Sequence, residues 1–236
     1  MVVMPAYFTP TTPVKFINFD YEKLFDEMKE YLGGLSFFPE WETFWYKLFL
    51  EADEQIINYI KEFPNSNPII QRLKHNQASV DYEIFNYEQI RNGGSFYMHF
   101  DVEKMKKYQK YNSLPIKTIK LDDLAIDPDT PLLKHKFNDV NLPYFVRMYG
   151  TRESFICVDG NKRILAKMEK GQQEFDGYLF EDHILQDMFL GAPDLSYYIF
   201  NKECEYMFRV MNEQDSTDQD VLQVTQMYLQ QNNDQS

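Results

Sequence analysis

The chain has 236 residues, 44% of them hydrophobic and 17% aromatic, which suits one sizeable domain or two small ones and excludes a disordered protein. Its 24 basic and 37 acidic residues give a formal net charge of -13, which repels nucleic acid. No apolar run approaches the length of a membrane span, and the first residues lack the pattern of a signal peptide. We therefore expect a cytoplasmic protein without membrane contact.

The first region, residues 1–112, is predicted to be mainly helical after a lead rich in proline and threonine. Apolar residues at helical spacing predict a helix over residues 24–32 that ends at Gly33. A longer helix is predicted to begin near Pro39 and to end in the proline-containing segment 64–68.

The end of this region is predicted to contain a turn, a strand and a further helix. Asn92-Gly93-Gly94 predicts a turn, and the alternation over residues 95–100 predicts a strand after it. Asp101 is then predicted to cap a helix that runs to about Tyr111. The basic run 104–107 lies beside acidic residues, so it is interpreted as a solvated face of this helix.

The second region, residues 113–181, alternates between strand and helix patterns. Residues 116–121 predict a strand. The further predicted elements are a loop (127–131), a hairpin of two strands (144–148 and 153–158), a helix (162–170) and a strand (175–180). This order indicates an α/β unit.

The third region, residues 182–236, is predicted to be helical. Asp194 is expected to cap a helix that runs to about Met211. One last amphipathic helix is predicted over residues 218–230, where it could bind a partner or a second copy of the chain. The expected fold class is therefore α+β, with a small α/β core and helical extensions at both ends.

The most informative segment is the turn between the strand that ends at Val158 and the following helix. Asp159 and Gly160 form a sharp turn, and Lys162 and Arg163 fall in the first turn of the helix. Helix N-termini carry partial positive charge, so two cations there suit a site for an external anion such as phosphate. The alternative is that Arg163 pairs with Asp159 and that Lys162 points into water.

The second region resembles the ParB/sulfiredoxin-like superfamily, and the resemblance covers residues 113–181 only. A strand-like segment at 115–121 and an apolar segment at 143–147 come first. The segment Cys157-Val-Asp-Gly-Asn-Lys-Arg-Ile-Leu-Ala166 follows, and its Asp-Gly-x-x-Arg core is similar to the family's box at a strand-to-helix turn. A strand over 171–180 completes the matching order.

In that superfamily the box typically cradles nucleotide phosphates. The resemblance thus implies phosphate binding by the backbone around Gly160, Asn161 and Lys162 together with the side chain of Arg163. Sulfiredoxins have a catalytic cysteine where this chain has Asn161, so a sulfiredoxin-type reductase is excluded. Many relatives have histidine where this chain has Lys162, and a fixed cation favours charge neutralisation over proton transfer. Nothing here indicates the helix-turn-helix domain of the partition proteins.

Other chemistry receives weaker support. A kinase-like activity needs a general base, for which Asp159, Asp122 and Asp123 are the available carboxylates. Asp122 and Asp123 are also weak candidates for holding Mg²⁺ beside a phosphate, although such a cluster is more often a solvated loop. Cys157 and Cys204 are interpreted as packed thiols in a reducing compartment. The four histidines lack the spacing of a metal site: His75, His99, His135 and His183.

These observations support one leading hypothesis and two alternatives. The leading hypothesis is a protein that binds a nucleotide or another phosphorylated small molecule, with possible nucleotide hydrolysis or phosphoryl transfer that uses Mg²⁺. The first alternative is a non-catalytic protein–protein interaction module. The second is a DNA-associated factor, which the net charge of -13 ranks last.

Overall fold

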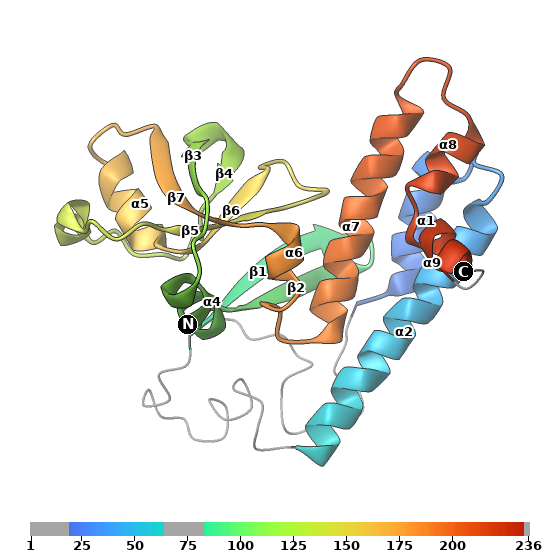
Figure 1. The fold of residues 1–236 in the computed structure, drawn as a ribbon, viewed down its shortest axis with the longest axis horizontal. Helices are drawn as coiled ribbons and strands as arrows, with labels where there is room; N and C mark the ends of the chain where they lie inside the picture. Colours follow the sequence, from blue (N-terminus) through green and yellow to red (C-terminus); the bar gives the residue numbers. More distant parts are fainter. Residues whose placement is uncertain (1–18, 64–82, 234–236) are drawn as a thin grey trace. The chain divides into compact units, whose positions relative to one another are not determined.

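The computed structural model describes residues 19–63 and 83–233, which form eight α-helices and two β-sheets (Figure 1). The chain is therefore an α+β protein, as expected. Its described residues divide into two compact units: unit 1 contains residues 19–63, 86–98 and 191–233, and unit 2 contains residues 83–85 and 99–190. This division differs from the three consecutive regions expected, because helices from both ends of the chain pack into one unit.

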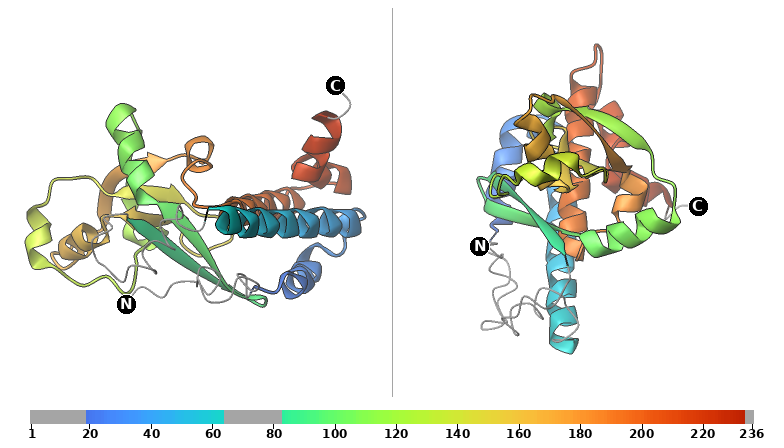
Figure 2. Two further views of the ribbon diagram at one scale, coloured as in Figure 1. Left: turned by 90° about the horizontal axis from the view of Figure 1, so that it is seen from below. Right: turned by 90° about the vertical axis from the view of Figure 1, so that its left-hand side faces the viewer.

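Unit 1 is built mainly from helices. Figure 2 shows its two longest helices, α2 (Phe38–Glu62) and α7 (Ala192–Met211), running side by side, and the two pack against each other. The other helices of unit 1 are α1 (Tyr21–Leu32), α8 (Asp218–Gln223) and α9 (Gln226–Asn233). None of the helices in the described ranges has the combination of length and apolarity needed to cross a bilayer.

An aromatic core holds α1, α2 and α7 together. The ring of Phe200, on α7, lies 5.3–5.9 Å from the rings of Phe25, Trp41, Trp45 and Phe49. Each of these five side chains is at most 1% exposed. Aromatic rings at such separations add to the free energy gained by burying their area, so Phe200 is central to the stability of unit 1.

A buried carboxylate fixes the C-terminal segment to this core. Glu203, on α7, is 3% exposed and accepts hydrogen bonds from the indole N–H groups of Trp41 and Trp45 and from the backbone N–H of Gln226. The Trp45 bond is 2.8 Å long and the Gln226 bond 2.5 Å. Burial raises the pKa of Glu203, while the three N–H donors oppose that rise.

The C-terminal segment differs from the single amphipathic helix predicted over 218–230. It is broken into α8 and α9, because the hydroxyl of Thr225 accepts the N–H of Tyr228 at 3.2 Å and so caps a new helix. Val221 and Met227 are 2% and 7% exposed. Leu222 is half-buried and Leu229 is 47% exposed, so only part of the predicted apolar face is covered within unit 1, and binding of a partner there stays a prediction.

A second carboxyl of unit 1, Asp53 on α2, is half-buried and contacts the first residue of α1. The hydroxyl of Tyr21 donates to Asp53 Oδ1 at 3.1 Å, and the Tyr21 ring stacks on Phe49 at 4.6 Å between centroids. Burial raises the pKa of Asp53 from its usual 3.8 to about 7, despite the opposing effect of the hydrogen bond from Tyr21.

Unit 2 contains a five-stranded mixed sheet with the order β3-β7-β5-β6-β4. Its strands are β3 (Ile116–Lys120), β4 (Leu124–Ala125), β5 (Tyr144–Arg147), β6 (Phe155–Asp159) and β7 (Glu174–Phe180). Its helices are α4 (Val102–Tyr111), α5 (Asn161–Met168) and α6 (Asp182–Leu185). Strands β5 and β6 are antiparallel, as the predicted hairpin requires, whereas β5 and β7 are parallel.

The core of unit 2 lies between the sheet and α5. Phe145 and Cys157 are fully buried on neighbouring strands, and Ile164 of α5 packs against them at 1% exposure. Burial also raises the pKa of the Cys157 thiol well above its usual value, so this thiol is inert packing, as expected.

Several local predictions are confirmed, and others are wrong. Asp101 caps α4 by accepting the N–H of Lys104 at 2.8 Å, as predicted. Asp194 does not cap α7: Gly191 takes that position, and Asp194 lies in the first turn at 3% exposure. The strand β2 (Gly94–Asp101) was predicted, but its partner β1 (Ile84–Arg91) was not. The predicted helix end at 64–68 lies outside the described residues.

Candidate functional site

The turn between β6 and α5 has the sharp geometry that the sequence predicts. Gly160 caps α5 with a φ of +105°, in the left-handed region that glycine adopts without strain. A Cβ atom at this position would lie 2.7 Å from Cβ of Pro143 and 2.8 Å from Nη2 of Arg163. Glycine is therefore required both for the backbone conformation and for the close approach of these neighbours.

Arg163 and Lys162 point in different directions. Nη2 of Arg163 donates to Asp159 Oδ2 at 3.1 Å and to the carbonyl oxygen of Leu142 at 3.4 Å. The side chains of Arg163 and Asp159 are 13% and 21% exposed, so their ion pair is largely shielded from water. Lys162 is exposed. The geometry thus agrees with the alternative in which Arg163 pairs with Asp159 and Lys162 is solvated.

Asn161 has a structural role in the same turn. Its side chain is 8% exposed, its Oδ1 accepts the backbone N–H of Asp127 at 3.1 Å, and its Nδ2 donates to the carbonyl of Cys157 at 2.8 Å. Asp127 in turn accepts hydrogen bonds within its own loop, from Asp129 N–H and from the hydroxyl of Thr130. Both polar ends of the Asn161 amide are therefore used to anchor this loop to β6.

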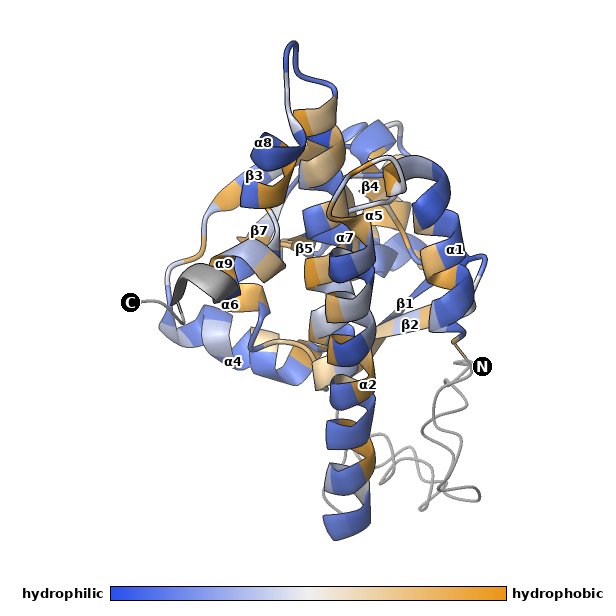
Figure 3. Cartoon of the chain, turned by 90° about the vertical axis from the view of Figure 1, so that its right-hand side faces the viewer, coloured by the Kyte–Doolittle hydropathy of each residue, from blue (hydrophilic) through white to orange (hydrophobic). Residues whose placement is uncertain are grey.

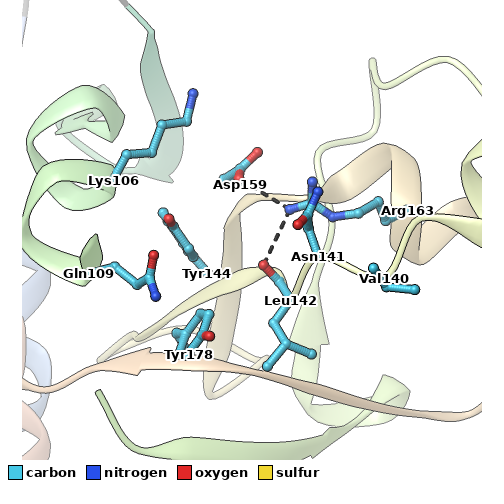
Figure 4. Close-up of a pocket in the computed structure, with 9 residues that line it drawn as sticks. All are labelled: Lys106, Gln109, Val140, Asn141, Leu142, Tyr144, Asp159, Arg163 and Tyr178. Carbon is cyan, nitrogen blue, oxygen red and sulfur yellow. Dashed lines mark hydrogen bonds and ion pairs between the residues drawn. The ribbon is translucent and has the colours of Figure 1, made fainter. Parts of the chain in front are cut away.

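A pocket of about 510 Å³ opens beside this turn in unit 2 (Figure 4). Arg163 and Asp159 line it from the turn, and Lys106 and Gln109 line it from α4. The other lining residues are Val140, Asn141, Leu142, Tyr144 and Tyr178. Of the four residues predicted to bind phosphate, only Arg163 lines this pocket; the candidate catalytic residue Asp159 lines it as well.

Strand register brings the two tyrosines and Asp159 together. Tyr144, the first residue of β5, lies opposite Asp159 on β6 and opposite Tyr178 on β7. The two tyrosine rings meet edge to face, with centroids 6.1 Å apart and an interplanar angle of 66°. Burial, and then the negative charge of Asp159, raises the pKa of Tyr144. Tyr144 therefore stays a neutral hydroxyl at ordinary pH.

Lys106 is the functional candidate that the sequence interpretation missed. The run 104–107 was interpreted as a solvated face, but Lys106 is half-buried and lines the pocket. It pairs with Glu83 at 2.5 Å and with Glu103 at 3.2 Å. A signal was present in the helical spacing: Lys106 follows the buried residue Val102 by four positions and so borders the packed side of α4.

The weak metal candidates lie apart from the pocket. Asp122 and Asp123 form part of the 3₁₀ turn Leu121–Asp123, where both are exposed, and neither lines the pocket. Over residues 19–63 and 83–233, no group of three or more histidine, cysteine, aspartate or glutamate side chains could hold a metal ion. His75 lies outside these ranges.

No protein-family model, curated protein or solved structure matches this chain. The residues of the pocket therefore carry the functional argument, and the ParB/sulfiredoxin-like core remains a prediction.

Proposed function

We propose that this protein binds a nucleotide or another phosphorylated small molecule in the pocket lined by Arg163 and Lys106. The observation that carries this proposal is that two cationic side chains from different elements line the same pocket. Its described lining holds two cations and one carboxylate, Asp159, in a chain with a net charge of -13. Two cations that line one concavity supply charged hydrogen-bond donors to an anion, while Glu83 and Glu103 pair with Lys106 from outside this lining.

Arg163 is the residue best suited to hold a phosphate. Its guanidinium is planar, permanently charged and largely shielded from water, which strengthens its interaction with an anion. Asp159 engages it through Nη2 alone, so the carboxylate does not use the paired donors of the guanidinium. Lys106 would add a second cation, although Glu83 and Glu103 already balance its charge in part.

The remaining lining suits the rest of such a ligand. A volume of about 510 Å³ lies within the range of small-molecule sites, roughly 300–1,000 Å³. Tyr144 and Tyr178 offer ring faces and edges to a flat aromatic group such as a base. Gln109 and Asn141 carry side-chain amides that can both donate and accept hydrogen bonds. The ParB/sulfiredoxin-like resemblance of residues 113–181 favours the same class of ligand.

Thermal stabilisation of the full chain tests this function. The ligands are inorganic phosphate, pyrophosphate and a panel of nucleoside mono-, di- and triphosphates, each with and without Mg²⁺. A ligand present at 100 times its dissociation constant stabilises the folded state by about 2.7 kcal/mol. At this chain length, that gain corresponds to a rise in melting temperature of about 5–10 °C.

Three single variants locate the site, each compared with its own ligand-free melting temperature. Arg163→Gln and Lys106→Gln are expected to reduce the ligand-induced rise, because each removes a cation from the pocket. Lys162→Gln is the matched control, since it removes an exposed cation next to Arg163 that does not line the pocket. If only Lys162→Gln lost the ligand-induced rise in melting temperature, the anion would bind at the turn and not in the pocket. If no compound raised the melting temperature of the wild type, a protein–protein interaction module would be favoured.

Catalysis forms a separate part of the proposal. Asp159 is the carboxylate among the described lining residues, so it is our candidate for a general base or for holding Mg²⁺ next to a phosphate. Asp159→Asn is expected to abolish phosphate release from a nucleotide that binds, while the thermal shift persists. Undiminished release in this variant would exclude that role.

A further inference from the structure

Unit 1 has a groove of about 500 Å³ between α1 and α2, separate from the pocket of unit 2. Five carboxylates and one lysine line it. Glu22 and Asp26 come from α1, and Glu42, Glu51 and Glu54 come from α2. The lysine, Lys47, lies 3.6 Å from Glu51. The other four carboxylates of the groove therefore have no partner cation among the residues that line it.

The groove also offers an apolar surface among these charges. Leu50 is 48% exposed, Tyr46 is half-buried, and the ring of Phe25 lies below them, 6.1 Å from that of Tyr46. Figure 3 shows hydrophobic positions interspersed along the otherwise hydrophilic helix α2. Thr43, Tyr46 and Leu50 recur at spacings of three and four residues, which places them along one side of that helix.

Charge and geometry restrict what can occupy this groove. Nucleic acid, anionic lipid and a second copy of this acidic chain would all be repelled by the carboxylates. No cluster in the described ranges could hold a metal ion. From Glu42 to Glu54 the groove follows twelve residues of α2, or about 18 Å at 1.5 Å per residue, which matches about three turns of a helix.

From these constraints we infer that the groove between α1 and α2 binds a short, basic, amphipathic helix of a partner protein. Apolar residues of the partner cover Leu50 and Tyr46, as in other helix-in-groove complexes. Lysine or arginine residues on both sides of that apolar stripe pair with the carboxylates of α1 and α2. The charges set the rate and orientation of binding, while the apolar contact supplies affinity and specificity.

A designed probe tests this inference on the full chain. It is a fluorescent helical peptide of about 12 residues, with leucines at helical spacing between flanking lysines, and its binding is followed by fluorescence anisotropy at low and high salt. One control peptide replaces the lysines by glutamine, and another replaces the leucines by serine. We expect saturable binding of the probe that weakens with salt, and at least about tenfold weaker binding of each control peptide.

Matched protein variants locate the binding surface. Leu50→Ala is expected to weaken binding at least about fivefold, whereas Leu229→Ala, at a leucine of similar exposure in the same unit, should leave it unchanged. The double variant Glu22→Gln/Asp26→Asn should weaken it more than Glu62→Gln/Glu213→Gln, which removes the same charge outside the groove. No saturable binding, equal binding of the serine peptide, or an undiminished affinity in Leu50→Ala would each overturn the inference.

Discussion

Replacing Glu203 by alanine removes the acceptor of three hydrogen bonds at once. Trp41 and Trp45 would keep buried indole N–H groups without their partner, and Gln226 would lose the bond that fixes the start of α9. Each buried donor left unsatisfied costs about 1–3 kcal/mol. The backbone of α9 can move to reach water, so the lasting cost comes from the two indoles.

The two indole donors together cost about 2–6 kcal/mol. Removal of a buried carboxylate offsets part of this cost, because that charge no longer has to be desolvated. We expect a net loss of about 2–4 kcal/mol in the free energy of unfolding of unit 1. At about 2–4 °C per kcal/mol for a chain of this length, its melting temperature should fall by about 4–16 °C.

Tryptophan fluorescence is a direct assay for this change, because the chain has two tryptophans and both donate to Glu203. Urea titrations of wild type and Glu203→Ala would give the stability difference, and Glu213→Ala, at an exposed position of the same unit, is the control. Glu203→Gln retains an oxygen that both indoles can donate to, but it replaces the oxygen that accepts the N–H of Gln226. It should therefore weaken the attachment of α9 with a smaller loss of unfolding free energy. A loss below about 0.5 kcal/mol in Glu203→Ala, with unshifted emission, would refute the reasoning.

Three further predictions concern the turn between β6 and α5 and the half-buried carboxyl of Asp53. Gly160→Ala should lower the free energy of unfolding of unit 2 by more than about 2 kcal/mol, because the new Cβ would clash with Pro143 and Arg163. Gly171→Ala is the control: its φ is also positive, at +85°, but no atom lies within 4 Å of the new Cβ. It should cost about 1 kcal/mol in the same urea titration. Asn161→Asp loses its donor to the neighbouring carbonyl and should cost about 1–3 kcal/mol; unchanged amide exchange in the loop that it anchors would contradict this. The folded-state pKa of Asp53 is raised, so its stabilisation is fully present below pH 3.8 and is lost as pH rises through about 7. The melting temperature of unit 1 should therefore fall between about pH 4 and pH 7 and level off above that range. Asp53→Asn should reduce this fall, and an equal dependence of the melting temperature on pH in wild type and variant would contradict the prediction.

Local chemistry made several elements predictable. Asp101 marks the start of α4 because its side chain accepts a backbone N–H of the first turn, and Gly33 marks the end of α1. The same rules misplaced the start of α7, since an acid such as Asp194 is favoured in a first turn whether or not it is the cap. The break at Thr225 depends on one hydroxyl within an otherwise regular apolar pattern.

The candidate site was predictable only in part. The Asp159–Gly160 turn and the position of Arg163 follow from neighbouring residues, so the sequence indicated them. Tyr144 and Tyr178 meet through the register of two parallel strands, which no short-range pattern specifies. Packing around the turn likewise decides that Arg163 pairs with Asp159 while Lys162 is exposed to water.

Most of unit 2, residues 99–190, is inserted in the chain between residues 86–98 and 191–233 of unit 1. During synthesis, Trp45 and Phe49 therefore leave the ribosome long before Phe200, the ring on which they pack. The separation between Phe49 and Phe200 is 151 residues (200 minus 49), which at roughly 5–20 residues per second takes about 8–30 s. During that time the aromatic side chains of α1 and α2 are exposed, because α7, which buries them in the folded protein, has not yet been synthesised. Unit 2 is by then complete. The nascent chain thus has a defined period in which a holding chaperone would protect it from aggregation.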